Sequence, residues 1–249
     1  MSKLHYITGV NIPIPVLKQE LHQPTIKEIA LMGEDYCFSC VSVFKMSDGK
    51  KLSQKVKQEK GLNMEFSDFE AFMQLVLTEG NLNKQIESFF FLLFPTLSNI
   101  VWTESTFSMK FNNNKKAVIM TPSIFQEIKD VILIMFCLDE ESQPEEFNPI
   151  NDKAAKIAEK LKRHRERIAR QNKNIQEDVD DNDDFLSNMI SCFSAVGQIP
   201  VTDILGYPYY QLIQQFRRSM MLKAATDQIR MSVMGGLKAE DMIDWQKPL

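Results

Sequence analysis

PYYQLIQQFRRSMMLKAATDQIRMSVMGG, residues 208–236, predicts one long helix in the last fifth of the sequence. Pro208 suits the first turn of a helix, and Gly235 and Gly236 suit its end. Apolar side chains recur between them at helical spacing, at Tyr210, Ile213, Phe216, Met220, Met221, Ala224, Ile229 and Met234. A helix of this length with one apolar face favours a mainly α fold.

Composition agrees with a helical, globular protein. Glycine is scarce, at 9 of 249 residues, and 44% of the residues are hydrophobic, which is an ordinary supply of core material. The formal net charge is -4, so the field of the whole molecule does not attract nucleic acid or anionic membrane. The longest apolar runs, 89–94 and 131–138, are far shorter than a membrane-spanning helix. Without a secretory pattern at the N-terminus, we expect a soluble cytosolic protein whose four cysteines are reduced.

Composition also divides the chain into three parts. Residues 1–150 read as an α-rich N-terminal domain, and 138–151 end it with two prolines and five acids. Residues 151–184 read as a charged helical linker, in which six acids fall within 177–184. Residues 185–249 return to apolar periodicity and are expected to form a helical C-terminal domain. We expect proteolysis to begin near 171–184, and deletion of the C-terminal domain to spare the N-terminal fold.

Helices are predicted in the N-terminal domain over 25–33, 36–44, 67–80 and 122–137. Thr25 with Glu28, and Ser67 with Glu70, have the spacing of a capping box, in which the two side chains satisfy each other's backbone N–H groups. Over 36–44 a helix is favoured above a strand, although aromatic and β-branched residues crowd there. Thr121 followed by proline opens the fourth helix.

A small β element is expected over 100–120. Two extended runs rich in β-branched and aromatic residues flank Asn112–Asn114. Asparagine tolerates the positive φ angles of hairpin turns, so this segment predicts a β-hairpin.

Cys37 and Cys40 form a C-x-x-C pair, which could bind zinc or exchange electrons. Zinc needs four ligands, and the chain has no second C-x-x-C pair; Cys137, Cys192 and the three histidines are scattered. Because residues three apart share a helix face, two small buried thiols explain the pair without chemistry, and we favour this interpretation.

The charged runs are interpreted mainly as solvated surface. An EF-hand loop beginning at Asp178 would need glycine at position 183 and glutamate at 189, and the sequence has neither, so a hinge is favoured over a calcium site. Residues 153–173 hold nine Lys or Arg with a narrow apolar seam. A solvated linker helix is favoured there, then a protein contact, and then nucleic-acid binding, since no aromatic residue stands among the charges to stack on bases.

No catalytic motif is recognised. The sequence lacks a nucleophile with a base, a paired-carboxylate pattern or a phosphate loop at known spacing. We therefore expect a protein that is not an enzyme and that needs no cofactor or metal.

Methionine is concentrated in the C-terminal part, where six of the 14 methionines fall within residues 185–249. A methionine-rich surface can adapt to different apolar helices, although a methionine stripe at helical spacing is more often core. The pattern therefore indicates either a core face or a groove for a partner helix.

Several short motifs together carry a resemblance. They are IPVTDILGYPYY at 199–210, FRR at 216–218, GG at 235–236, DWQK at 244–247, and near the start QPTIKEIA at 23–30 with GEDY at 33–36. In this arrangement, which covers about 100 of 249 residues, the chain resembles tail assembly chaperones of tailed bacteriophages that infect Gram-positive hosts.

The resemblance implies a non-enzymatic protein that coats the long, helical, aggregation-prone tape measure protein while the phage tail is built. It also implies a location in the host cytoplasm and absence from the mature virion. The residues placed to grip a partner helix are Tyr209, Tyr210, Phe216, Met220 and Trp245. The same surfaces could pair two copies of this chain, and no membrane partner is expected. The alternatives are a structural virion or connector protein and, less favoured, a nucleic-acid-binding replication or regulatory factor that uses 153–173.

Overall fold

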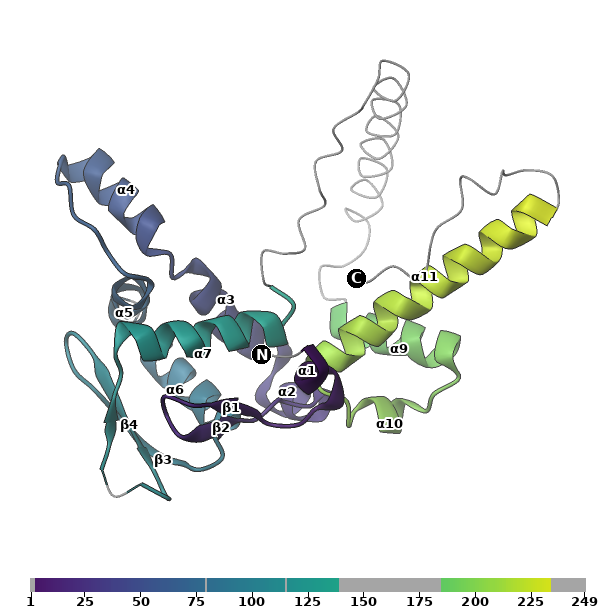
Figure 1. The fold of residues 1–249 in the computed structure, drawn as a ribbon, viewed down its shortest axis with the longest axis horizontal. Coiled ribbons are helices and arrows are strands. Elements are labelled where there is room, and N and C mark those ends of the chain that lie inside the picture. The colour runs from purple at the N-terminus through teal and green to yellow at the C-terminus, as the bar shows by residue number, and fades with distance from the viewer. Residues whose placement is uncertain (1–2, 79, 115, 139–184, 234–249) are drawn as a thin grey trace, which may run out of the picture. The chain divides into compact units, whose positions relative to one another are not determined.

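The chain is mainly α-helical, as its composition predicts. The computed structural model describes residues 3–78, 80–114, 116–138 and 185–233 (Figure 1). The expected linker helix and acidic hinge, and the expected cleavage sites at 171–184, lie outside these ranges. Within them, no helix is both long enough and apolar enough to cross a membrane.

Helices account for most of the described residues, and they are α1 (Lys3–Thr8), α2 (Ile26–Met32), α3 (Glu34–Met46), α4 (Gly49–Lys60), α5 (Asp68–Thr78), α6 (Leu82–Leu93), α7 (Pro122–Met135), α9 (Phe185–Gly197), α10 (Val201–Ile204) and α11 (Tyr209–Val233). The strands are short, and they are β1 (Ile12–Ile14), β2 (Gln19–Leu21), β3 (Leu97–Trp102), β4 (Phe107–Phe111) and β5 (Val118–Ile119). The long C-terminal helix predicted from residue 208 onward is α11.

The chain divides into two compact units, and their limits differ from the three parts expected from composition. One unit contains 1–139 together with 193–249, and the other contains 140–192. Of the second unit, the structure describes the first turns of α9, from residue 185 to 192. In the first unit, the start of α11 packs against α1 and α7, although these elements are far apart in the sequence.

The predicted helix starts are confirmed in atomic detail. The Thr25 hydroxyl accepts a hydrogen bond from the Glu28 backbone N–H, and the Glu28 carboxylate accepts one from the Thr25 N–H at 2.8 Å, which completes the capping box of α2. Ser67 and Glu70 make the same reciprocal pair at α5. Thr121 caps α7, and the segment around residues 36–44 is helical, as α3.

The β element is larger than the single hairpin predicted over 100–120. The expected turn at Asn112–Asn114 follows β4, which pairs antiparallel with β5. β3 adds a third strand on the other side of β4, so the sheet order is β3-β4-β5. A second hairpin, β1-β2, was not predicted, because three-residue strands are too short to show an alternating pattern.

Aromatic side chains fill the interior of the first unit. Phe44, Phe72 and Phe125 lie at its centre, with the Phe72 and Phe125 ring centroids 4.7 Å apart and the Phe44 and Phe125 rings nearly parallel. Phe90 and Phe107 extend the cluster, their centroids 5.7 Å apart. Each large ring removes much apolar surface from water, so this cluster holds α3, α5, α6, α7 and β4 together.

A buried lysine fixes α4 and α5 relative to α7. Lys129 of α7 is 7% exposed, donates to the Ser47 carbonyl and forms an ion pair with Asp68, the first residue of α5. Asp68 also accepts a hydrogen bond from the Gly49 N–H at 2.8 Å. Only glycine fits at position 49, because a Cβ there would lie 2.1 Å from the Phe66 carbonyl oxygen. We call these contacts the Lys129 junction.

Candidate partner-binding surface

The segment before α11 completes the N-terminus of α2. The first N–H groups of a helix have no partner within the helix. Here the Ile26 N–H donates to the Tyr207 carbonyl at 2.9 Å, and the Lys27 N–H donates to the Leu205 carbonyl at 3.0 Å. The QPTIKEIA and YPYY motifs, which are almost 180 residues apart in the sequence, are therefore joined by backbone hydrogen bonds.

Tyr209 and Tyr210 are core residues of this chain. Each is 7% exposed. The Tyr209 ring centroid lies 5.4 Å from that of Phe38 and 5.3 Å from that of Phe136, and the Tyr210 centroid lies 5.4 Å from that of Tyr6. Burial raises the pKa of the Tyr209 hydroxyl above its usual value. The two tyrosines expected to grip a partner instead anchor α11 to its own fold.

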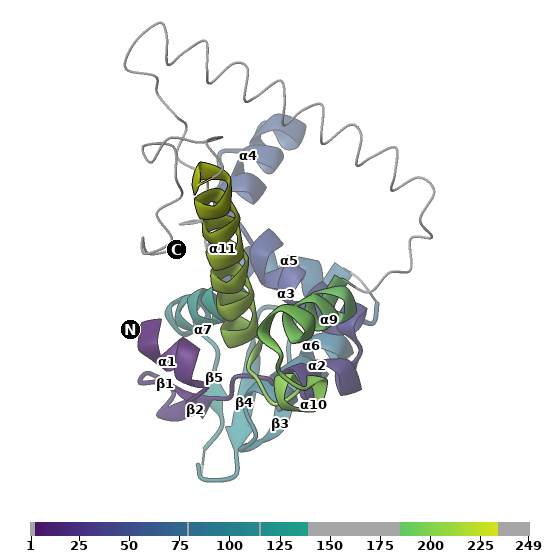
Figure 2. The same ribbon diagram turned by 90° about the vertical axis from the view of Figure 1, so that its right-hand side faces the viewer.

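Further along α11, the same helix face becomes exposed. Ile213 is buried, Phe216 is half-buried, and Met220 is 44% exposed. Their spacing of three and four residues places them in one row, which we call the α11 stripe. Figures 1 and 2 both show the later turns of α11 extending beyond α1 and α7. Of the residues expected to contact a partner, the structure therefore brings Phe216 and Met220 together on an accessible face, and Trp245 lies outside the described residues.

Basic side chains flank the stripe. Arg217 and Lys223 are exposed on α11, and each lies three residues from Met220 along the helix. An apolar row beside positive charge suits an amphipathic partner helix that carries carboxylates next to its apolar face.

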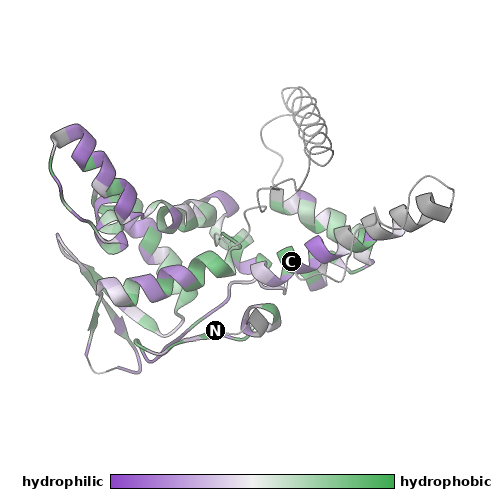
Figure 3. Ribbon diagram, turned by 45° about the horizontal axis from the view of Figure 1, so that its top comes forward, coloured by the Kyte–Doolittle hydropathy of each residue, from purple (hydrophilic) through white to green (hydrophobic). Residues whose placement is uncertain are grey.

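A second surface lies between α4 and α5, and sequence patterns alone do not predict it. An open cavity of about 340 Å³ is lined by Met46, Asp48, Lys51, Leu52, Lys55, Ala71, Gln74, Leu75 and Thr78. α4 is mostly hydrophilic, as Figure 3 shows for the helix at the upper left, and its apolar face is narrow because it consists of Leu52 and Val56. The sequence marks α4 as a helix mainly at its two ends. The Asp48 side chain accepts a hydrogen bond from the Lys51 N–H at the start, and Gly61 ends the helix in the left-handed conformation. We call this cavity the α4–α5 groove.

Cys37 and Cys40 are fully buried on α3, as predicted. Burial raises the pKa of both thiols to about 12, so neither forms the reactive thiolate at neutral pH. In the described ranges, no three His, Cys, Asp or Glu side chains gather as a metal site would require.

Both exposed surfaces present apolar side chains. The α11 stripe presents apolar side chains, and the α4–α5 groove presents an apolar floor with lysines along one side. Neither contains a nucleophile next to a base. No protein-family model matches this chain, and no curated protein and no solved structure matches it either.

Proposed function

We propose that this protein is a non-enzymatic chaperone that binds a helical, apolar partner protein, and that the partner is the tape measure protein of a tailed bacteriophage. The α11 stripe is the observation that carries the binding role, because it is buried at one end and exposed at the other. The resemblance of 199–210, 216–218 and 23–30 to tail assembly chaperones supports the choice of partner. The alternative of a structural virion protein would use the same surfaces.

The exposed end of the stripe favours contact with another helix. A helix laid alongside α11 would meet Phe216 and Met220 at the spacing of its own turns. Burying the exposed part of Met220 would contribute about 1 kcal/mol, since full burial of such a side chain contributes about 1.5–3 kcal/mol. This contribution is small beside the free-energy cost of association. Stable binding therefore requires further apolar residues along the same row of α11. In the sequence the row does continue, with Ala224 four residues after Met220 and Met231 seven residues after Ala224.

Methionine suits a partner with many similar but non-identical helical segments. Its unbranched side chain adapts to different apolar surfaces at little cost. A chaperone that coats a long helical protein needs this tolerance more than it needs one precise fit.

Coexpression with the tape measure protein tests the proposal. We expect the tape measure protein to become soluble with the wild-type chain and to precipitate with Met220→Asp, because the variant places a charge in the apolar contact. Leu31→Asp is the matched control, since Leu31 is exposed on α2, away from the stripe. If solubility of the tape measure protein is the same with and without this chain, the proposal is wrong. Mass spectrometry of purified particles separates the alternative, because a structural subunit would be present in stoichiometric amount.

A further inference from the structure

The α4–α5 groove has walls of regular geometry. Its α4 wall carries Lys51, Leu52 and Lys55, which share one helix face because they are three and four residues apart. Its α5 wall carries Ala71, Gln74, Leu75 and Thr78, with the same spacing. Met46, at the end of α3, is 60% exposed at the edge of the groove. The groove therefore has an apolar floor of leucine and alanine side chains between two helices, with Met46 at its edge.

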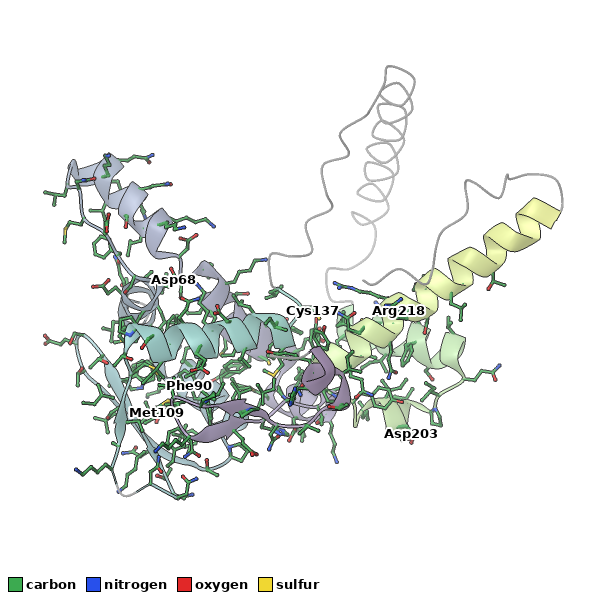
Figure 4. All side chains as sticks on the ribbon, viewed as in Figure 1. Asp68, Phe90, Met109, Cys137, Asp203 and Arg218 are labelled. Carbon is green, nitrogen blue, oxygen red and sulfur yellow. The ribbon has the colours of Figure 1, made fainter. Side chains whose placement is uncertain are left out.

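The Lys129 junction holds these walls in place. Asp68, labelled in Figure 4, is the first residue of α5 and binds both Lys129 and the N-terminal Gly49 of α4. Both helices are thus tied at the same end through one carboxylate. The groove is a feature of the folded unit and does not need a ligand to form it.

Charge is distributed unequally around the groove. The α4 side is basic, because its part of the lining carries Lys51 and Lys55 beside one acid, Asp48. Lys51 pairs with Asp48 at 3.5 Å, but its side chain is 81% exposed, and an exposed pair of this kind exchanges readily for another carboxylate. The α5 side contributes the neutral Gln74 and Thr78. A ligand with one row of carboxylates and one apolar row complements both features.

We propose that the α4–α5 groove binds an acidic amphipathic segment of a partner protein. Apolar side chains of the segment pack on Leu52 and Leu75, and its carboxylates lie against Lys51 and Lys55. A volume of about 340 Å³ suits a few side chains rather than a whole helix. The apolar floor favours a protein over a nucleic acid, because the lining has no aromatic side chain on which a base could stack. This site is separate from the α11 stripe and does not depend on the function proposed for it.

Fluorescence anisotropy with the full chain tests this site. The probe is a labelled peptide of about twelve residues with leucines three and four positions apart on a glutamate background, which forms one apolar row along a helix. We expect it to bind the wild-type protein, and to bind more weakly as salt is raised, because the contacts with lysine are partly screened. The same peptide with glutamine in place of glutamate should bind at least about tenfold more weakly.

Variants locate the site. Lys51→Glu with Lys55→Glu should weaken peptide binding at least about tenfold. Lys84→Glu with Lys110→Glu makes the same change in net charge at exposed positions on α6 and β4, and it should leave binding unchanged. Met46→Ser should also weaken binding, whereas Leu62→Ser, another exposed apolar residue outside the groove lining, should not.

Two results would overturn the inference. If the two double variants bind the peptide equally, or the peptide does not bind, no acidic segment occupies the groove. If a labelled single-stranded oligonucleotide binds in a Lys51- and Lys55-dependent way and the peptide does not, the surface is a nucleic-acid site. Met220→Asp should retain peptide binding, so failure of this inference and failure of the α11 proposal are distinguishable.

Discussion

Replacing Lys129 with methionine should destabilise the first unit through the loss of one ammonium group. Methionine keeps most of the apolar stem of lysine, so core packing changes little. The variant removes the ion pair with Asp68 and the hydrogen bond to the Ser47 carbonyl. Breaking a buried ion pair typically costs about 3–5 kcal/mol. Asp68 is 30% exposed and keeps its hydrogen bond from the Gly49 N–H, so the expected loss is about 2–3 kcal/mol.

Chemical denaturation of wild type and Lys129→Met, followed by circular dichroism, measures this loss. Lys45→Met is the matched control, because Lys45 is exposed on α3, and its free energy of unfolding should change by less than about 0.5 kcal/mol. Asp68→Asn combined with Lys129→Met should cost less than the sum of the single changes, since both remove the same pair. A change below about 0.5 kcal/mol for Lys129→Met would show that the pair contributes nothing net, as happens when desolvation cancels attraction.

Three further changes test other parts of the fold. Gly9→Ala should lower the free energy of unfolding by about 1 kcal/mol or more beyond the effect of Gly61→Ala. Both glycines have φ near +68°, so both substitutions strain the backbone. Only at Gly9 would the added Cβ also meet another side chain, the ring of the proline before α11, at 2.7 Å. Glu28→Gln should lower the free energy of unfolding at neutral pH, and by progressively less as pH falls below about 4.5. Burial raises the pKa of Glu28, but hydrogen bonds from its capping partner and a neighbouring histidine outweigh burial and hold this pKa below its usual 4.5. The stability that the carboxylate contributes is therefore present above pH 4.5 and is lost as pH falls through the folded-state pKa. Alkylation of the native protein, read by mass spectrometry, should modify the exposed Cys192 quickly and Cys37 only after unfolding; equal rates would contradict the burial that raises the pKa of Cys37 to about 12.

The sequence predicted best those features that local hydrogen bonding decides. A threonine three residues before a glutamate specifies the start of α2 without reference to the rest of the chain, and the same holds for Ser67 and Glu70 at α5. α4 was harder to predict, because it has only two apolar residues, Leu52 and Val56, and its position depends on Lys129, about 80 residues away. Short β1 and β2 depend on pairing with each other rather than on their own composition.

The candidate site was predicted only in part, for a related reason. Helical spacing identified the apolar row of Ile213, Phe216 and Met220 on α11, but spacing cannot show which turns of a long helix are covered by the same chain. The structure shows that Tyr209 and Tyr210 are covered by α1, α3 and the end of α7, while Met220 is exposed. The α4–α5 groove depends on two helices meeting, and no single stretch of sequence contains that information.

The position of α11 bears on how the C-terminal segment can be separated from the rest. Deletion of 185–249 was expected to spare the N-terminal fold, on the ground that each part has its own core. In the structure, that deletion would remove the carbonyl partners of Ile26 and Lys27 and would uncover the Phe38 and Phe136 rings that pack on Tyr209. Unpaired helix N–H groups and exposed rings both favour the unfolded chain. A cut that tests partner binding without disturbing the fold must therefore lie within α11, after Phe216, where the helix stops contributing to the core and its apolar face becomes exposed.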